Sequence, residues 1–161
     1  MRYDPSEDKW RQLAPSPLTR RAGHSAVWTG EEMIVWGGVP AGEASDNQLV
    51  LSDGAAYDPE ADSWRRIPNA PIRSREGGGA QAVWTGEEMI AWGGGGHRGR
   101  ADGIAYDPAS NGWRRIPEAP LTGRDRHTAV WTGSAMLVWG GCCDSDRYYA
   151  DGALYSHARA E

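Results

Sequence analysis

Short apolar runs alternate with glycine- and proline-rich turns along the whole chain. Residues 24–28 and 33–36 are two such runs, joined by the sequence TGEE, which is typical of a tight hairpin. Residues 55–57 form a third run, which an Asp-Pro turn ends, and residues 64–67 form a fourth. The first two runs do not alternate with polar residues, which favours a sheet covered on both faces. Because no segment sustains a 3.6-residue apolar period, the pattern predicts an all-β protein of short strands.

The same pattern occurs three times. The block AVWTGEEMIVWGG at residues 26–38 returns as AVWTGEEMIAWGG at 82–94 and as AVWTGSAMLVWGG at 129–141. A second block, DGxAYDP-x4-W, follows the first two copies, and its beginning, DGALY, follows the third. Tyr3, Asp4, Pro5 and Trp10 repeat the end of this second block ahead of the first copy. A period near 50 residues is typical of the blades of a β-propeller.

At these positions the chain resembles the Kelch family, whose repeat has a double glycine after its second strand and then a spaced tyrosine and tryptophan. The wording HSAVWTG and EMIVWGG is more similar to bacterial Kelch repeats than to animal ones. The residues that match this motif are Gly37-Gly38, Tyr57 and Trp64; Gly93-Gly94, Tyr106 and Trp113; Gly140-Gly141 and Tyr155; and Trp10 in the leading partial repeat. The resemblance implies a Kelch-type β-propeller with three four-stranded blades per chain.

Three blades do not close a ring, because propellers have four to eight. We expect a single module over residues 1–161, with an N-terminal strand at 9–13, blades at 23–67 and 78–116, and an incomplete blade at 126–155. The strand at 9–13 is expected to complete a blade of a partner. Two interpretations remain open: a homodimer that closes one six-bladed propeller by strand exchange, or a fragment of a longer propeller.

Composition excludes several classes of partner. The 161 residues carry a formal net charge of −5, which disfavours nucleic acids and anionic membranes as ligands. The hydrophobic content of 39% is too low for a membrane protein, and the start MRYDPSEDKW is charged where a signal peptide would be apolar. The expected location is therefore cytoplasmic by default, or extracellular if the sequence is a piece of an exported protein.

Positions that are identical in every repeat are interpreted as scaffold, because every blade needs packing. The Arg65-Arg66 and Arg114-Arg115 pairs are expected to protect outer strands, although they could also form a basic patch. Asp53, Asp102 and Asp151 each precede a glycine, which predicts a turn or hydrogen-bonding role in preference to a metal site. The repeated tryptophans are predicted to form the core between blades, in preference to a ligand-stacking row: Trp28, Trp36, Trp64, Trp84, Trp92, Trp113, Trp131 and Trp139.

Variation between the repeats is concentrated in the loops between strands two and three and in the linkers between blades, which emerge on one face. Loops on a rigid scaffold commonly carry binding groups. Arg21, Arg75 and Arg126 are interpreted as matching positions before strand one, where guanidinium groups could bind a carboxylate or pair with neighbouring acidic residues. The other candidate binding residues on this face are His97, Arg98, Arg100, Asp144, Arg147 and Tyr148.

Motifs of known enzymes are missing from the sequence. Cys142 and Cys143 are adjacent and are expected to be free thiols; no metal set and no cofactor are predicted. The glycine-rich segment 93–100 lacks the Lys-Ser/Thr of a phosphate-binding loop. The sequence therefore predicts a module that recognises a peptide, a protein segment or a glycan. The alternatives are a sugar-directed isomerase or oxidase with its site at the channel mouth, and a structural fragment of a larger propeller.

Overall fold

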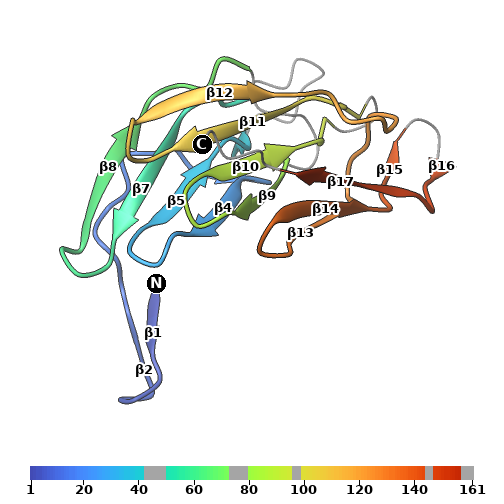
Figure 1. Cartoon of the computed structure of the whole chain (residues 1–161). Helices are drawn as coiled ribbons and strands as arrows, with labels where there is room; N and C mark the ends of the chain where they lie inside the picture. The colour runs from blue at the N-terminus through green and yellow to red at the C-terminus, as the bar shows by residue number, and fades with distance from the viewer. Residues whose placement is uncertain (42–49, 73–79, 96–98, 144–146, 157–161) are drawn as a thin grey trace.

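The computed structural model describes residues 1–41, 50–72, 80–95, 99–143 and 147–156, and all regular structure in these ranges is β (Figure 1). None of the described residues belongs to a helix that could cross a bilayer. The predicted all-β class is confirmed.

Three antiparallel sheets follow one another along the chain, and we call them the first, second and third blades. The first blade has the order β4 (Ser25–Trp28), β5 (Met33–Trp36), β7 (Gly54–Asp58), β8 (Ser63–Ile67). The second has the order β9 (Gln81–Trp84), β10 (Met89–Trp92), β11 (Gly103–Asp107), β12 (Gly112–Ile116). The third contains β13 (Thr128–Trp131), β14 (Ala135–Trp139) and β17 (Gly152–Ser156), so in the described residues it has three strands.

An N-terminal hairpin extends away from these blades (Figure 1). Its strands are β1 (Arg2–Asp4) and β2 (Lys9–Arg11), and Tyr3 lies opposite Trp10. Tyr57 lies opposite Trp64 and Tyr106 opposite Trp113 in the outer strands of the first and second blades. The hairpin therefore has the structure of the two outer strands of a blade. Of the strand expected at 9–13, residues 9–11 are in β2, which pairs with β1 of the same chain.

Two short ladders tie the linkers between blades to the loops between strands two and three. β3 (Arg21–Ala22) pairs with β6 (Val39–Pro40), and β15 (Cys142–Cys143) pairs with β16 (Arg147–Tyr148). Both ladders lie at the end of the blades opposite to the TGEE turns.

The double glycines adopt backbone conformations that other residues avoid. All six have positive φ, from 68° at Gly140 to 95° at Gly141. A Cβ atom on Gly38 would lie 2.5 Å from the Ala22 carbonyl oxygen, and one on Gly141 would lie 2.6 Å from the Asp125 carbonyl oxygen. Glycine is thus required where the end of strand two passes the linker that enters the same blade.

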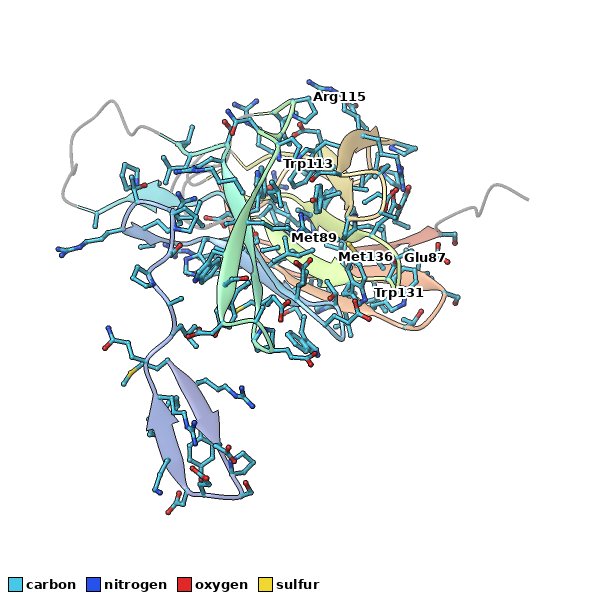
Figure 2. The ribbon with its side chains drawn as sticks, turned by 90° about the vertical axis from the view of Figure 1, so that its left-hand side faces the viewer. Glu87, Met89, Trp113, Arg115, Trp131 and Met136 are labelled. Carbon is cyan, nitrogen blue, oxygen red and sulfur yellow. The ribbon has the colours of Figure 1, made fainter. Side chains whose placement is uncertain are left out.

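The core lies between the blades, in two clusters. Met89 is buried between the first and second blades and Met136 between the second and third (Figure 2). Trp36 and Trp92 are fully buried in these clusters, as predicted. Trp28 and Trp139 correct the prediction that all repeated tryptophans are core, because both are more than half exposed. They lie on the first and third blades, each of which has a sheet face that no described blade covers.

Candidate binding face

We call the end of the blades that carries the linkers and the strand-two-to-three loops the loop face. Its segments are joined through the backbone. The Arg124 amide donates to the Arg100 carbonyl (3.2 Å), and Asp125 and Cys142 exchange two hydrogen bonds of 2.8 and 2.9 Å. The linker that enters the third blade is therefore fixed to the loops of the second and third blades, which gives the loop face a defined arrangement around this linker.

Arg21 is part of the scaffold of this face. Its side chain is 5% exposed, and its Nη1 donates to the carbonyl oxygens of Gly37 (3.0 Å) and Asp53 (3.3 Å). Its Nη2 donates to the Asp53 carboxylate at 3.0 Å. The prediction of a hydrogen-bonding role for Asp53 is confirmed, because the carboxylate compensates a buried guanidinium at the start of strand three.

Arg124 repeats this arrangement in the third blade. Its side chain is fully buried, and its Nη1 donates to the Gly140 carbonyl (3.0 Å) and the Asp151 carboxylate (2.6 Å). Its guanidinium also lies 4.4 Å above the Tyr149 ring. The hydrogen bond from Arg124 lowers the pKa of Asp151 below its usual value.

The equivalence of Arg21 and Arg126 predicted from the sequence is therefore corrected: Arg124 is the counterpart of Arg21. Arg126 takes the place of Gly23, and the two have similar φ angles of 54° and 61°. Two arginines lie two residues apart in this linker, and the inward-facing one binds the aspartate. The comparison of repeats chose the wrong arginine of this linker. The correct counterpart is indicated by the spacing, because Arg124 precedes His127 by three residues, as Arg21 precedes His24.

His127 is buried behind the loop face. It is 4% exposed and makes an edge contact with the Trp92 ring at 5.1 Å. Burial, together with the nearby Arg124 charge, lowers its pKa to about 4, so the imidazole is neutral at pH 7. Arg124 and His127 bring a cation and a titratable group together, but neither is accessible to a substrate in this arrangement. His24, at the equivalent position of the first blade, is exposed.

Four of the candidate binding residues are exposed on the described part of the loop face. Arg100, Arg126 and Arg147 are exposed, and Tyr148 is 79% exposed. Asp125 holds the Arg126 backbone, since its carboxylate accepts the Arg126 amide at 2.7 Å. The remaining candidates lie outside the described residues: Arg75, His97, Arg98 and Asp144.

The opposite end of the blades, which we call the turn face, contains ion pairs that sequence analysis missed. Arg65 binds both carboxylate oxygens of Glu32, with Nε 2.9 Å from Oε1, and Arg114 binds Glu88 in the same way. These arginines fasten the TGEE turn to the outer strand of their blade. A comparison of the repeats could have found these pairs. The first two copies have both the glutamate and the later Arg-Arg pair, whereas the third copy reads TGSA, with Ala135 in place of the glutamate, and has no Arg-Arg pair after it. A broad groove of about 1280 Å³ crosses this face.

The described residues contain no group of three or more His, Cys, Asp or Glu side chains that could hold a metal ion. Cys142 is a free, half-buried thiol. The predicted free state of this cysteine is confirmed, while the Cys143 side chain lies outside the described part of the chain.

Comparison with known proteins agrees with this architecture. A family model described as the KLHDC2/KLHL20/DRC7 Kelch-repeats domain matches residues 1–141. The chain belongs to the Kelch-repeat family. Kelch-like protein 23 of Pongo abelii is 32% identical over 76 residues, which are 47% of this chain and 13% of that protein. Among solved structures, the structure of YjhT matches 93% of the Kelch chain with a TM-score of 0.74 and 16% identity.

The predicted Kelch-type propeller fold is thus confirmed. The Kelch chain spans 55% of the YjhT chain and a smaller part of Kelch-like protein 23. At 16% identity the likeness to YjhT concerns the fold alone.

Proposed function

We propose that this Kelch module recognises a carboxylate-bearing peptide or protein segment on its loop face. The observation that carries the proposal is the exposure of Arg100, Arg126 and Arg147, with Tyr148, on segments that are joined through the backbone. Guanidinium groups bind carboxylates through paired hydrogen bonds, and tyrosine supplies contact area at a low entropic cost.

The buried layer beneath these residues supports the same interpretation. Asp53 and Asp151 are engaged by Arg21 and Arg124, so these carboxylates compensate buried charges. The exposed arginines of the loop face are a separate set and are directed to solvent. A rigid inner layer reduces the entropy lost when the outer side chains bind a ligand.

Fluorescence anisotropy with a labelled hexapeptide of alternating Glu and Asp tests this function, and the matching Gln and Asn peptide is the control ligand. We expect Arg100→Ala combined with Arg126→Ala to weaken binding of the acidic peptide at least about tenfold. Arg115→Ala is the matched control, because Arg115 is exposed on β12 at the outer edge of the second blade (Figure 2). Thermal stability is expected to stay unchanged in all variants.

Equal binding of the acidic and amide peptides, or an equal loss in the Arg115 variant, would contradict a specific carboxylate site. Arg75→Ala, at a candidate position outside the described residues, is expected to act in the same direction as Arg126→Ala. A sugar acid that binds while the peptides do not would favour the glycan interpretation of the same face.

We also propose that the module self-associates as a two-fold dimer that forms one six-bladed ring. The outer face of the third blade supports this: Val130, Leu137, Leu154 and Trp139 are between 37% and 64% exposed. The first three are direct neighbours across β13, β14 and β17. Such a continuous apolar face is typical of an interface.

The equivalent residues of the first blade show what this face is suited to bind. Val27, Ile34, Ala56 and Trp36 are buried in the cluster between the first and second blades. The third blade therefore presents the same surface that packs against a following blade elsewhere in the chain. Light scattering over a dilution series is expected to give a species of twice 17.5 kDa. A monomer at every concentration would exclude the dimer, and polydisperse aggregate would favour a fragment of a larger propeller.

A further inference from the structure

A tryptophan from the outermost strand fills a slot between the first two blades. Trp113 on β12 lies between Trp36 of the first blade and Tyr106 of its own blade, with ring centroids 5.4 and 4.9 Å apart. Its Nε1 donates to the Pro68 carbonyl oxygen at 2.8 Å. Trp64 makes the equivalent contacts one blade earlier, with the Tyr57 ring at 5.0 Å and the Ala14 carbonyl at 3.1 Å. The contacts of this indole with the tyrosine opposite it and with a linker carbonyl are thus repeated, and Trp113 adds the contact with the preceding blade.

The corresponding slot between the second and third blades is a cavity of about 140 Å³. Its walls include Trp92, Pro117 and Tyr155, which occupy the positions of Trp36, Pro68 and Tyr106. Ile116 and Met136 make the lining mainly apolar, and Glu118 and Ser156 are its polar members. An apolar cavity of about 150 Å³ holds a benzene ring, so this mainly apolar cavity has the size for an aromatic ring.

The strand that would carry this side chain is absent from the described part of the third blade. β17 pairs with β14 along one edge, and no described strand pairs with its other edge. Tyr155 nevertheless has the place of Tyr106, because it lies opposite Met136 on β14 as Tyr106 lies opposite Met89 on β10. Arg114 of the second blade, which binds Glu88, also donates a hydrogen bond to the Tyr155 hydroxyl. Both walls of the slot and the adjoining strand edge are therefore formed within one chain.

Trp10 is the remaining tryptophan of this structural type. It lies opposite Tyr3 with ring centroids 5.2 Å apart, as Trp64 and Trp113 lie opposite their tyrosines. Unlike those two it is 64% exposed, on the hairpin that extends from the body. Four residues after it, Ala14 accepts the hydrogen bond from Trp64, just as Pro68 accepts that of Trp113.

From this match we infer that the slot between the second and third blades binds Trp10 of a second copy of the chain, with residues 9–13 paired along β17. The inference rests on the self-association proposed above, and it assigns Trp10 as the side chain that anchors the dimer. The Trp10 Nε1 donates to the Pro117 carbonyl, and Leu13 takes the position of Ile67 and Ile116. The partner is a second copy because β1–β2 and β17 lie at opposite ends of the row of blades (Figure 1).

The strand exchange is expected to increase the number of backbone-paired residues. β2 has three paired residues with β1, whereas β8 and β12 each have five with their strand three. When residues 9–13 leave β1 for β17, the same tyrosine–tryptophan pair forms with Tyr155 in place of Tyr3. Two copies also supply enough blades for one ring, since one chain matches 55% of the YjhT propeller.

The test begins with the dimer dissociation constant, measured by sedimentation velocity. Trp10→Ala is expected to raise this constant at least about 30-fold, as removal of a buried aromatic anchor does. Tyr148→Ala is the control, because it removes an aromatic of the loop face that is even more exposed than Trp10, and it is expected to leave the constant unchanged. Both variants are expected to fold, since each side chain is exposed in the single chain.

A photo-crosslinker in place of Trp10, in a mixture of isotopically light and heavy chains, then locates the contact. Crosslinks between light and heavy chains at residues 117–121 or 153–156 are expected. A dimer that crosslinks elsewhere, or that withstands Trp10→Ala, would overturn the assignment of the slot and leave the self-association intact. A wild-type chain that stays monomeric would overturn both.

Discussion

Two effects destabilise alanine in place of a glycine of this fold: the positive φ of the backbone and the clash of the added methyl group. A comparison of Gly38 with Gly30 separates them. At Gly38, φ is +92° and an added Cβ would lie 2.5 Å from the Ala22 carbonyl oxygen and 3.0 Å from the His24 nitrogen. At Gly30, in the first TGEE turn, φ is +108°, but nothing lies within 4 Å of an added Cβ. Alanine at either position is destabilised by the positive φ of the backbone. Only at Gly38 would its methyl group also clash with the linker.

The expected magnitudes follow from this comparison. Gly30→Ala should lower the free energy of unfolding by about 1–2 kcal/mol, the cost of the backbone conformation. Gly38→Ala should lower it by a further 1–3 kcal/mol or so, because two backbone atoms must move to admit the methyl group. Gly141→Ala should resemble Gly38→Ala, since its Cβ would lie 2.6 Å from the Asp125 carbonyl oxygen.

Urea unfolding followed by tryptophan fluorescence measures these differences, at one fixed protein concentration because self-association would shift the midpoint. The slope of the free energy with urea is expected to be the same in all variants. If Gly38→Ala and Gly30→Ala lose the same free energy within about 0.5 kcal/mol, the close approach of linker and strand is not what requires the second glycine, and the reasoning is wrong.

Two further predictions concern buried and paired side chains. Because His127 is neutral in the fold, the unfolded chain binds the extra proton, and stability should fall as the pH drops from 6.5 to about 4, by up to roughly 3 kcal/mol. His127→Phe should remove this part of the pH dependence in urea unfolding, His24→Phe should not, and an unchanged profile in the His127 variant would contradict the burial argument. For the turn face, a double-mutant cycle with Glu32→Gln and Arg65→Gln should give a coupling of about 1 kcal/mol, since the paired contact is partly exposed. Additive effects would mean that the pair does not fasten the turn.

Much of the fold could be predicted because the repeats compare the sequence with itself. Strands bounded by TGEE and by Asp-Pro, the glycines with positive φ and the cross-strand pair of Tyr57 and Trp64 all depend on local sequence. The candidate site was harder. Arg21 and Arg126 were both selected as binding residues, yet the buried pairs with Asp53 and Asp151 involve Arg21 and Arg124. The spacing to His24 and His127 identifies Arg124 as the counterpart of Arg21, but the sequence does not show that these two side chains are buried against an aspartate.

The sequence by itself determined the class of fold, the number of repeats and the residues that every blade needs, because short-range backbone and packing requirements recur with each copy. The tertiary structure decided which of the repeated residues are covered. Trp36 and Trp139 have the same place in their blades, but one is buried against the next blade and the other is exposed. Burial depends on the neighbouring sheet, and so does the slot between the second and third blades, whose walls come from segments far apart in the chain.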